Sequence, residues 1–356
     1  MMSLSDERLI HDPAEWNALV AQYRLDCYYE HAYFGLEEDD GIPEMFFYPT
    51  EFGTLIYPYV KRNIDGTPYQ DITTPYGYGG PVFVGLWSLD QIREVRQHFL
   101  EYCQTEQIIT ETIRFHPLLQ NVELGQYWCR STKELQRTVT IELTDTFETI
   151  EGGFSKMTRR NIRKARKEGV TVRVAGEADY ETFERLYRLT MDKHDAAPRY
   201  YFSHTYFEQF TRGELDAELL VAERGGNIIG GCLVLYGDRF AHYHLGASDP
   251  EQLQVRPNHL LFAEMIRRAK QKGMVAIHLG GGTTPDETDS LFVYKSSFNE
   301  GSRTFFSIGS SVLDEVAYEQ VNRSFLKNNP SAAASNWFPT YRTPIRHLSQ
   351  RGEETS

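Results

Sequence analysis

Two histidines with strand spacing are the first side chains in the sequence that could do chemistry. His242 and His244 stand in an aromatic and apolar run that predicts a strand, and side chains two apart on a strand point to one face. Two imidazoles on one face could accept a proton, contact a substrate or coordinate a metal. A zinc site needs at least a third protein ligand, and none stands at a suitable spacing, so no metal is expected. Partly buried packing is the structural alternative.

A short basic segment could bind a phosphate backbone. Six of the nine residues between 159 and 167 are Lys or Arg, whereas the whole chain has a formal net charge of −13. That total excludes a surface that binds polyanions everywhere, but a local cationic patch still attracts them. Arg159, Arg160, Arg163 and Lys164 are therefore candidate contacts to nucleic acid. The alternative is a solvated helix face whose charges pair with nearby acids.

Glycine and tyrosine alternate in a loop of the first half, at residues 76–81 (YGYGGP). Glycine lets a backbone approach a ligand closely, and Tyr76 and Tyr78 would then line the binding site. A tight connection between two elements explains the same residues equally well.

Length and composition indicate a folded, two-domain protein. The chain has 356 residues, 40% of them hydrophobic, with 21 Phe and 22 Tyr, and single cores stop growing at roughly 250–300 residues. No run of 18 apolar residues and no charged-then-apolar leader is found, so we expect a cytoplasmic protein without an integral membrane segment. The four cysteines are far apart and are interpreted as buried apolar side chains.

The first half predicts a β-rich unit. Residues 13–23 predict a helix, because Asp12 can cap its free amides and Pro13 suits its first turn. A second helix is predicted at 89–102 by its apolar spacing. Residues 73–81 predict a loop. Strands are predicted at 44–48, 54–60, 107–114, 127–130 and 137–143.

The second half predicts a clearer order of elements. Gly225 and Gly226 tolerate positive φ and predict a hairpin between two apolar runs. Helices are predicted at 155–168, 177–194, 203–211 and 258–272, and strands at 170–174, 219–223, 228–236, 239–246 and 275–279. A further helix is predicted at 311–327, and the residues after Asn328 are expected to be loosely ordered.

This order, helices and a meander followed by a strand-helix-strand crossover, resembles the acetyltransferase fold. We therefore expect an α+β protein made of two tandem acyl-CoA N-acyltransferase (GNAT)-like domains. The boundary is placed where Glu151-Gly-Gly breaks the pattern, which gives domains at 1–145 and 146–309. The segment 310–356 is expected to return to the first domain.

Three stretches of the second half together resemble the FemABX family of aminoacyltransferases. They are residues 157–165 (MTRRNIRKA), 260–273 (LLFAEMIRRAKQKG) and 291–298 (LFVYKSSF). Tyr78-Gly-Gly-Pro is similar to the Gly-Pro loop of the family. Members of the family transfer an aminoacyl group from aminoacyl-tRNA to an amine of a cell-wall precursor, and short members lack a helical arm, as this chain does.

The resemblance implies site residues for such a reaction. It makes Lys295 the cationic donor to the oxyanion, between Phe292 and Phe298, which could exclude water. Tyr294 and Phe298 of the same segment are candidate substrate contacts. A surface lysine whose stem covers apolar neighbours is the alternative. The resemblance also suggests that Arg199, in residues 197–201 (APRYY), holds an acceptor phosphate, with Tyr201 as a wall residue. An arginine paired with nearby aspartates is the alternative.

Departures from the family leave the substrates open. Residues 254–258 (QVRPN), where coenzyme A enzymes have a glycine-rich turn, contain no glycine, and Pro257 removes an amide. Acyl-CoA is therefore less expected than aminoacyl-tRNA as donor, and no cofactor is expected. The first half lacks the lysine and acidic residue that bind the precursor in the family. A nucleotide-linked or lipid-linked precursor and a small amine remain open as acceptors, as do a non-catalytic binding role and the oligomeric state.

Overall fold

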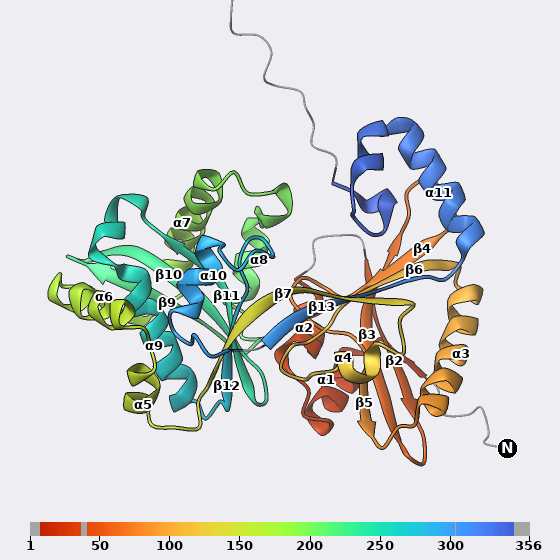
Figure 1. The fold of residues 1–356 in the computed structure, drawn as a ribbon, viewed down its shortest axis with the longest axis horizontal. Coiled ribbons are helices and arrows are strands. Elements are labelled where there is room, and N and C mark those ends of the chain that lie inside the picture. The colour runs from red at the N-terminus through yellow and green to blue at the C-terminus, as the bar shows by residue number, and fades with distance from the viewer. Residues whose placement is uncertain (1–7, 37–40, 303, 345–356) are drawn as a thin grey trace, which may run out of the picture.

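A computed structural model describes residues 8–36, 41–302 and 304–344, and Figure 1 shows their fold. One mixed sheet runs through both halves in the order β1-β2-β3-β4-β6-β13-β7-β12-β11-β10-β9-β8, and β5 pairs with β3 beside this path. The predicted α+β fold with helices on a mixed sheet is confirmed.

The first half contains most of the strands. Its strands are β1 (Arg8–Ile10), β2 (Ile42–Pro49), β3 (Gly53–Asn63), β4 (Gln70–Thr73), β5 (Val82–Gly85), β6 (Ile108–Arg114), β7 (Ser131–Glu142) and the late β13 (Thr304–Val312). Its helices are α1 (Pro13–Gln22), η1 (Cys27–Tyr29), α2 (His31–Phe34), α3 (Leu89–Thr105), α4 (Val122–Gly125), α11 (Glu315–Asn328), η4 (Pro330–Ala334) and η5 (Thr340–Arg342). As predicted, Asp12 caps α1 by accepting the amide of Glu15.

The second half follows the predicted order closely. Its strands are β8 (Thr171–Val174), β9 (Ala217–Arg224), β10 (Asn227–Tyr236), β11 (Phe240–Ser248) and β12 (Ala276–Gly280). Its helices are α5 (Phe147–Gly152), α6 (Lys156–Lys167), α7 (Asp179–Lys193), η2 (Pro198–Tyr200), α8 (His204–Gln209), η3 (Pro250–Val255), α9 (Pro257–Gln271) and α10 (Ser290–Ser296). Gly225 and Gly226 have φ of 58° and 81°, as the hairpin between β9 and β10 requires.

Two predictions about local structure are wrong. Residues 127–130 form turns after α4 and not a strand, because Trp128 is buried against Phe99 and Tyr57 from a turn. Residues 330–344 are ordered and not loose, while residues 345–356, on which the same prediction falls, lie outside the described residues. Tyr341 is buried and shares a hydrogen bond with Thr110 of β6, which holds the segment on the first half.

The late strand β13 returns the chain to the first half. It pairs with β6 and β7, and α11 then packs on β6. Strand β7 also pairs with β12 of the second half. In Figure 1, β7 and β13 cross the middle of the molecule. The expected boundary between residues 309 and 310 falls inside β13.

Two cores cover the opposite faces of the second half of the sheet. Helix α9 packs on one face in a core that includes Leu261 and Ile277. Helix α7 packs on the other face, and its core also contains Trp16 of α1 and Tyr33 of α2. The first and second halves therefore share a hydrophobic core.

Candidate active site

Strands β11 and β12 are parallel neighbours for three residues and then separate. Their pairing ends at His242 and His278, although β11 continues to Ser248 on β10 and β12 continues to Gly280 on β7. We call the opening beyond this last pair the fork. Among the described residues, no strand pairs with the backbone groups along the two edges of the fork, so a substrate could be held there.

Lys295 of α10 lies at the fork. Its side chain is buried, and its Nζ donates a hydrogen bond of 2.8 Å to the carbonyl of Gly281, just after β12. Nζ also lies 5.1 Å from the centre of the Tyr243 ring on β11. Burial lowers the pKa of Lys295 to about 7, although the charge of Asp289 opposes this effect. This lysine can therefore gain or lose a proton near neutral pH.

Tyr78, from the glycine loop of the first half, reaches the same place. A Cβ atom on Gly280 would lie 3.4 Å from Lys295 Nζ and 3.9 Å from the Tyr78 hydroxyl, so both polar groups face this glycine. The Tyr78 hydroxyl also lies 3.1 Å from Nε2 of His278. Burial raises the pKa of Tyr78, which keeps its hydroxyl protonated. The loop thus brings a neutral phenol next to a titratable amine.

A chain of hydroxyl groups sets the tautomer of His278. Thr304 Oγ1 donates to Thr140 Oγ1 (3.0 Å), and Thr140 Oγ1 lies 3.0 Å from Nδ1 of His278. The Thr140 hydroxyl then donates to Nδ1, so Nε2 carries the proton and donates to Tyr78. Burial and the charges of His242, His116 and Lys295 lower the pKa of His278. A neutral His278 leaves the Tyr78 O–H free to donate to a substrate.

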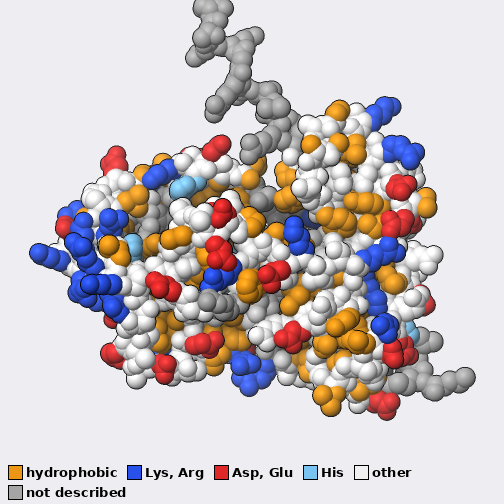
Figure 2. Space-filling view, viewed as in Figure 1, with side chains coloured by type: hydrophobic (Ala, Val, Ile, Leu, Met, Phe, Trp, Pro, Cys, Tyr) orange, Lys and Arg blue, Asp and Glu red, His pale blue; other side chains and the backbone are white. Residues whose placement is uncertain are grey.

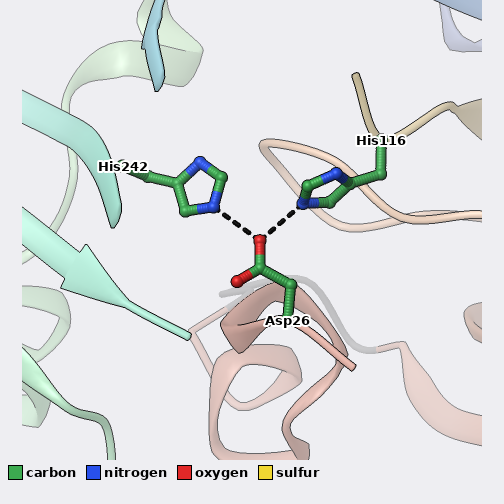
Figure 3. A group of neighbouring side chains, drawn as sticks. All are labelled: Asp26, His116 and His242. Atoms are coloured by element: carbon green, nitrogen blue, oxygen red, sulfur yellow. Dashed lines mark hydrogen bonds and ion pairs between the residues drawn. The ribbon is translucent and has the colours of Figure 1, made fainter. Parts of the chain in front are cut away.

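Asp26 joins two histidines deep between the halves (Figure 3). Its Oδ2 accepts hydrogen bonds from Nε2 of His116 (2.6 Å) and from Nε2 of His242 (2.5 Å). All three side chains are at most 2% exposed. Asp26 and His116 belong to the first half and His242 to β11, so this cluster, the Asp26 triad, also links the two halves.

The electrostatics of the Asp26 triad favour an ionised carboxylate. Burial by itself would raise the pKa of Asp26, but the hydrogen bonds that His116 and His242 donate to the carboxylate lower it far below its ordinary value. Burial lowers the pKa of His116, although its hydrogen bond to Asp26 opposes this. His116 is therefore a neutral donor to a charged acceptor.

The Asp26 triad does not fit a metal ion. Nδ1 of His116 accepts the amides of Leu118 and Leu119, which puts the ring proton on Nε2, the atom that would have to bind the metal. The N–O distances of 2.5 and 2.6 Å are also shorter than the roughly 3.3 Å that separates ligand atoms placed tetrahedrally about 2 Å from one ion. The three groups are hydrogen-bonded to one another instead.

His244 and Tyr76 form an aromatic wall beside the triad. The side chains of His242 and His244 are buried on the same side of β11, as predicted. The Tyr206 hydroxyl lies 2.5 Å from His244 Nε2. Burial lowers the pKa of His244 to about 3, so it stays neutral. The Tyr76 ring lies 5.9 Å from His244, and its carbonyl accepts a hydrogen bond from Tyr33.

Other predicted site residues lie away from the fork. Phe298 is 2% exposed and packs on Phe154 in the core of the second half. Tyr201 is 37% exposed and donates a hydrogen bond to Asp192. Arg199 lies in η2, and its side chain lies outside the described residues.

Tyr294 lies between Lys295 and the basic helix. Its ring meets His259 at 5.1 Å, and His259 Nε2 lies 3.0 Å from Asn161 Nδ2 of α6. The Tyr294 hydroxyl is buried without a hydrogen-bond partner among the described residues, and burial raises its pKa. Tyr294 is thus a neutral phenol in contact with the N-terminal turn of α9.

Helix α6 presents the predicted basic segment to solvent. Figure 2 shows its cluster of Lys and Arg on the left of the molecule. Arg160, Arg163 and Lys164 are exposed, while half-buried Arg159 donates to the carbonyl of Gly152. Within the described part of the chain, one ion pair of this helix is found, between Arg166 and Glu264. The exposed side chains agree with the alternative of a solvated helix face, and few of its charges pair with nearby acids in the described residues.

The turn before α9 keeps the backbone shape of a glycine turn without glycine. Arg256 has a φ of 64°, in the left-handed region, and Pro257 is the first residue of α9. Proline suits that position, since the amide it lacks has no partner within the helix. That unpartnered amide would, however, be one of the donors to a phosphate at this helix start, so the turn keeps its left-handed residue but offers one donor fewer.

Asp26, His116 and His278 were missed from the sequence. Each stands alone in a loop or strand, and their proximity arises only when the two halves pack. The nearest signal was the Asp26-Cys-Tyr-Tyr run, which places a carboxylate within an aromatic stretch. A charged residue among rings is often buried and paired, and this would have been a reason to search for its partner.

The second half matches a known family of domains, and solved structures share the fold of the whole chain. Residues 153–296 match a family described as an acetyltransferase (GNAT) domain. FemX has a TM-score of 0.67 at 16% identity, over 88% of this chain and 99% of that one. L-PGS from Bacillus licheniformis has a TM-score of 0.56 at 11% identity, over 90% and 97% of the two chains.

A third structure extends this likeness. The C-terminal domain of a putative lysylphosphatidylglycerol synthetase from Agrobacterium fabrum has a TM-score of 0.54 at 14% identity, over 88% and 98% of the two chains. No curated protein matches the sequence significantly. Among the described residues, no helix has both the length and the apolar character to span a bilayer. The chain thus shares the fold of FemX, and its second half contains a GNAT domain, which supports the predicted class of enzyme, a transferase.

Proposed function

We propose that this protein moves an aminoacyl group from aminoacyl-tRNA to an amine of a cell-wall or other biosynthetic precursor, and that it does so at the fork. The observation that supports this most is Lys295. A buried amine whose pKa is about 7 stands at the fork of a GNAT domain. Such a group can stabilise negative charge as a cation and also exchange protons near neutral pH.

The proposed chemistry is attack of an amine on an acyl ester. The amine nitrogen forms a bond to the carbonyl carbon, the carbonyl oxygen becomes negative, and the ester C–O bond then breaks. The Lys295 ammonium and the Tyr78 hydroxyl supply hydrogen bonds to this oxygen, and Lys295 then protonates the leaving hydroxyl. Few waters compete with these donors at such a buried site, which strengthens their effect.

The basic face of α6, defined as Arg160, Arg163 and Lys164, supports tRNA as the donor. The helix packs on α9, and its Asn161 reaches Lys295 through His259 and then Tyr294. A tRNA whose backbone lies along α6 would therefore have its acylated end directed toward the fork. This places Tyr294 as a contact to the donor.

The acceptor is proposed to enter from the side of the first half. That side contains Tyr76, Tyr78, His242 and His244. Arg199 lies in the neighbouring η2, and Tyr201 follows it. FemX and a putative lysylphosphatidylglycerol synthetase share the fold, so a nucleotide-linked and a lipid-linked precursor both remain candidates. A cytoplasmic location agrees with either.

Acyl-CoA is the second candidate donor. The GNAT family match and the left-handed Arg256 before α9 both favour it, because free amides at this helix start can bind phosphate. Three helix amides without a glycine turn make a weaker site than a complete one. We therefore place acyl-CoA behind aminoacyl-tRNA.

A donor comparison tests the proposal. The wild type, Lys295→Ala and the exposed control Lys327→Ala are incubated with charged tRNA pools or acyl-CoA, together with amine acceptors, and products are read by mass. We expect an amide product from charged tRNA that Lys295→Ala loses and Lys327→Ala retains. A product formed only from acyl-CoA would refute aminoacyl-tRNA as the donor. Equal turnover in Lys295→Ala and the wild type would refute the role of Lys295 in the reaction. Tight acceptor binding without turnover would favour a binding protein.

The basic face has its own test. Replacing Arg163 and Lys164 by Glu should weaken tRNA binding and reduce its salt dependence, because each lost phosphate contact lowers the slope of log K against log salt by about 0.7–0.9. The matched control is the double change of Arg323 and Lys327 to Glu, which removes the same charge from exposed positions on α11. Equal salt slopes in both variants would contradict binding at α6.

A further inference from the structure

We propose that His242 is the base that takes the proton from the acceptor amine, and that Asp26 and His116 position it for this step. The inference rests on the proposed function and adds to it the group that removes the proton. It is built on one side chain from each of three separate segments, brought together where the two halves meet (Figure 3).

The hydrogen bonds fix where the protons lie. His116 accepts two backbone amides at Nδ1, so its Nε2 carries a proton and donates to Asp26. The ionised Asp26 is an acceptor only, and it therefore requires a proton on Nε2 of His242 as well. A neutral His242 then has its lone pair on Nδ1.

That Nδ1 atom has no partner. His242 is 1% exposed, and its Nδ1 makes no hydrogen bond within the described chain. In Figure 3 this nitrogen lies on the side of the ring away from Asp26. A buried polar atom without a partner is unfavourable unless a ligand or reaction uses it. The Nδ1 of His242 is thus a basic atom prepared for a proton.

The place of His242 suits this role. It belongs to the last pair before β11 and β12 separate, so its ring stands at the closed end of the fork. The rings around it are Tyr28 at 4.7 Å, His116 at 5.5 Å and His278 at 6.0 Å. His278 and Tyr28 are kept neutral, the first by a lowered pKa and the second by a raised one. His242 is therefore the member of this group of rings that has both a free nitrogen and an anionic partner.

The proton balance of the reaction is complete with this base. The amine attacks the ester carbonyl, a C–N bond forms, and the proton lost by nitrogen passes to Nδ1 of His242. The ester C–O bond breaks, and the leaving oxygen takes a proton from Lys295. Asp26 stabilises the resulting imidazolium, and solvent returns the proton from His242 to Lys295.

Asp26 can occupy this position because residue 237 is a glycine and has no side chain there. A Cβ atom on Gly237 would lie 1.7 Å from Asp26 Oδ1 and 2.8 Å from the amide of Cys27. The carboxylate therefore lies against the backbone of the turn between β10 and β11. This contact positions Asp26 relative to the strand that carries His242.

Two measurements on the full-length protein test the proposal. Nitrogen-15 NMR of labelled histidine should show His242 neutral with its proton on Nε2, and His242→Gln assigns the signal. In the acyl-transfer assay, His242→Gln should keep a donor to Asp26 but lose roughly 100- to 10,000-fold in kcat, with little change in KM. Asp26→Asn should lower the midpoint of the acid limb of the pH profile, because the anion no longer favours the imidazolium.

The outcomes separate a catalytic from a structural role. A His242→Gln variant with wild-type kcat, or a proton on Nδ1 at neutral pH, would overturn the proposal. If a folded Asp26→Asn variant has an unchanged pH profile, Asp26 does not position His242 for the reaction. If the wild type makes no amide from any donor, the proposed function fails, while the tautomer seen by NMR still decides whether His242 is prepared to act as a base.

Discussion

Replacing Lys295 by methionine should stabilise the protein at pH 6 and remove part of its pH dependence. The wild-type ammonium is buried with one hydrogen bond, to Gly281, and the Asp289 charge offsets its desolvation only in part. Methionine has a similar length and no charge, so it avoids this penalty. The lost hydrogen bond leaves the Gly281 carbonyl unpaired, which is an effect that does not depend on pH.

The magnitude follows from the pKa values. Burial moves the pKa of Lys295 from 10.5 in the unfolded chain to about 7 in the folded chain. At about 1.4 kcal/mol per pH unit, the charged lysine costs roughly 5 kcal/mol below pH 7, where both states are protonated. Between pH 7 and 10.5 only the unfolded chain binds the proton, so the wild type gains stability as the pH rises. From pH 6 to pH 9 this gain is about 2.5 kcal/mol.

Urea unfolding at pH 6, 7, 8 and 9 measures this gain. The free energy of unfolding of Lys295→Met minus that of the wild type should fall by about 2.5 kcal/mol across this range. The control Lys327→Met, at an exposed position of α11, should differ from the wild type by a constant amount. A constant difference for Lys295→Met as well would show that Lys295 is not desolvated, and the reasoning about its pKa would be wrong.

Three further predictions concern the rest of the site. Gly237→Ala should destabilise the fold by about 1–3 kcal/mol in urea unfolding, because its Cβ would overlap Asp26, whereas Gly152→Ala, which meets no atom within 4 Å, should have little effect. Tyr78→Phe should lower kcat in the acyl-transfer assay and cost about 1 kcal/mol of stability through the lost bond to His278; unchanged kcat would exclude the hydroxyl from the reaction. Charge reversal on the basic face of α6 should weaken tRNA binding at 50 mM salt far more than at 200 mM, as filter binding would show.

Local signals made the second half of the fold predictable. The glycine turn at 225–226 and the helix predicted at 258–272 each agree with the structure, because the forces that set them act within a few residues. Strand β13 could not be predicted in the same way. Its partners β6 and β7 lie far away in sequence, and no local feature of residues 304–312 records that pairing.

The site was only partly predictable for a related reason. Lys295 and the face shared by His242 and His244 follow from a motif and from strand geometry, both of which are local. Asp26 and His116 belong to the site only through long-range contacts. Asp26 is 216 residues from His242 in sequence and 90 residues from His116. No periodicity encodes such a contact, so the sequence indicates His242 as a possible proton acceptor but not the two partners that we propose position it.

The division of the Asp26 triad between the halves indicates why two domains are needed. The second half supplies His242 and Lys295, but without Asp26 nothing would fix the tautomer of His242 or stabilise its protonated form. Helices α1 and α2 share a core with β10 and β11, so a fragment of the second half alone would also expose that face of the sheet. In the proposed mechanism the first half thus positions His242 and also supplies the Tyr78 hydroxyl, while the second half carries Lys295 and His242. In an isolated second half we therefore expect Lys295 to be retained, whereas His242 would no longer be positioned as a base.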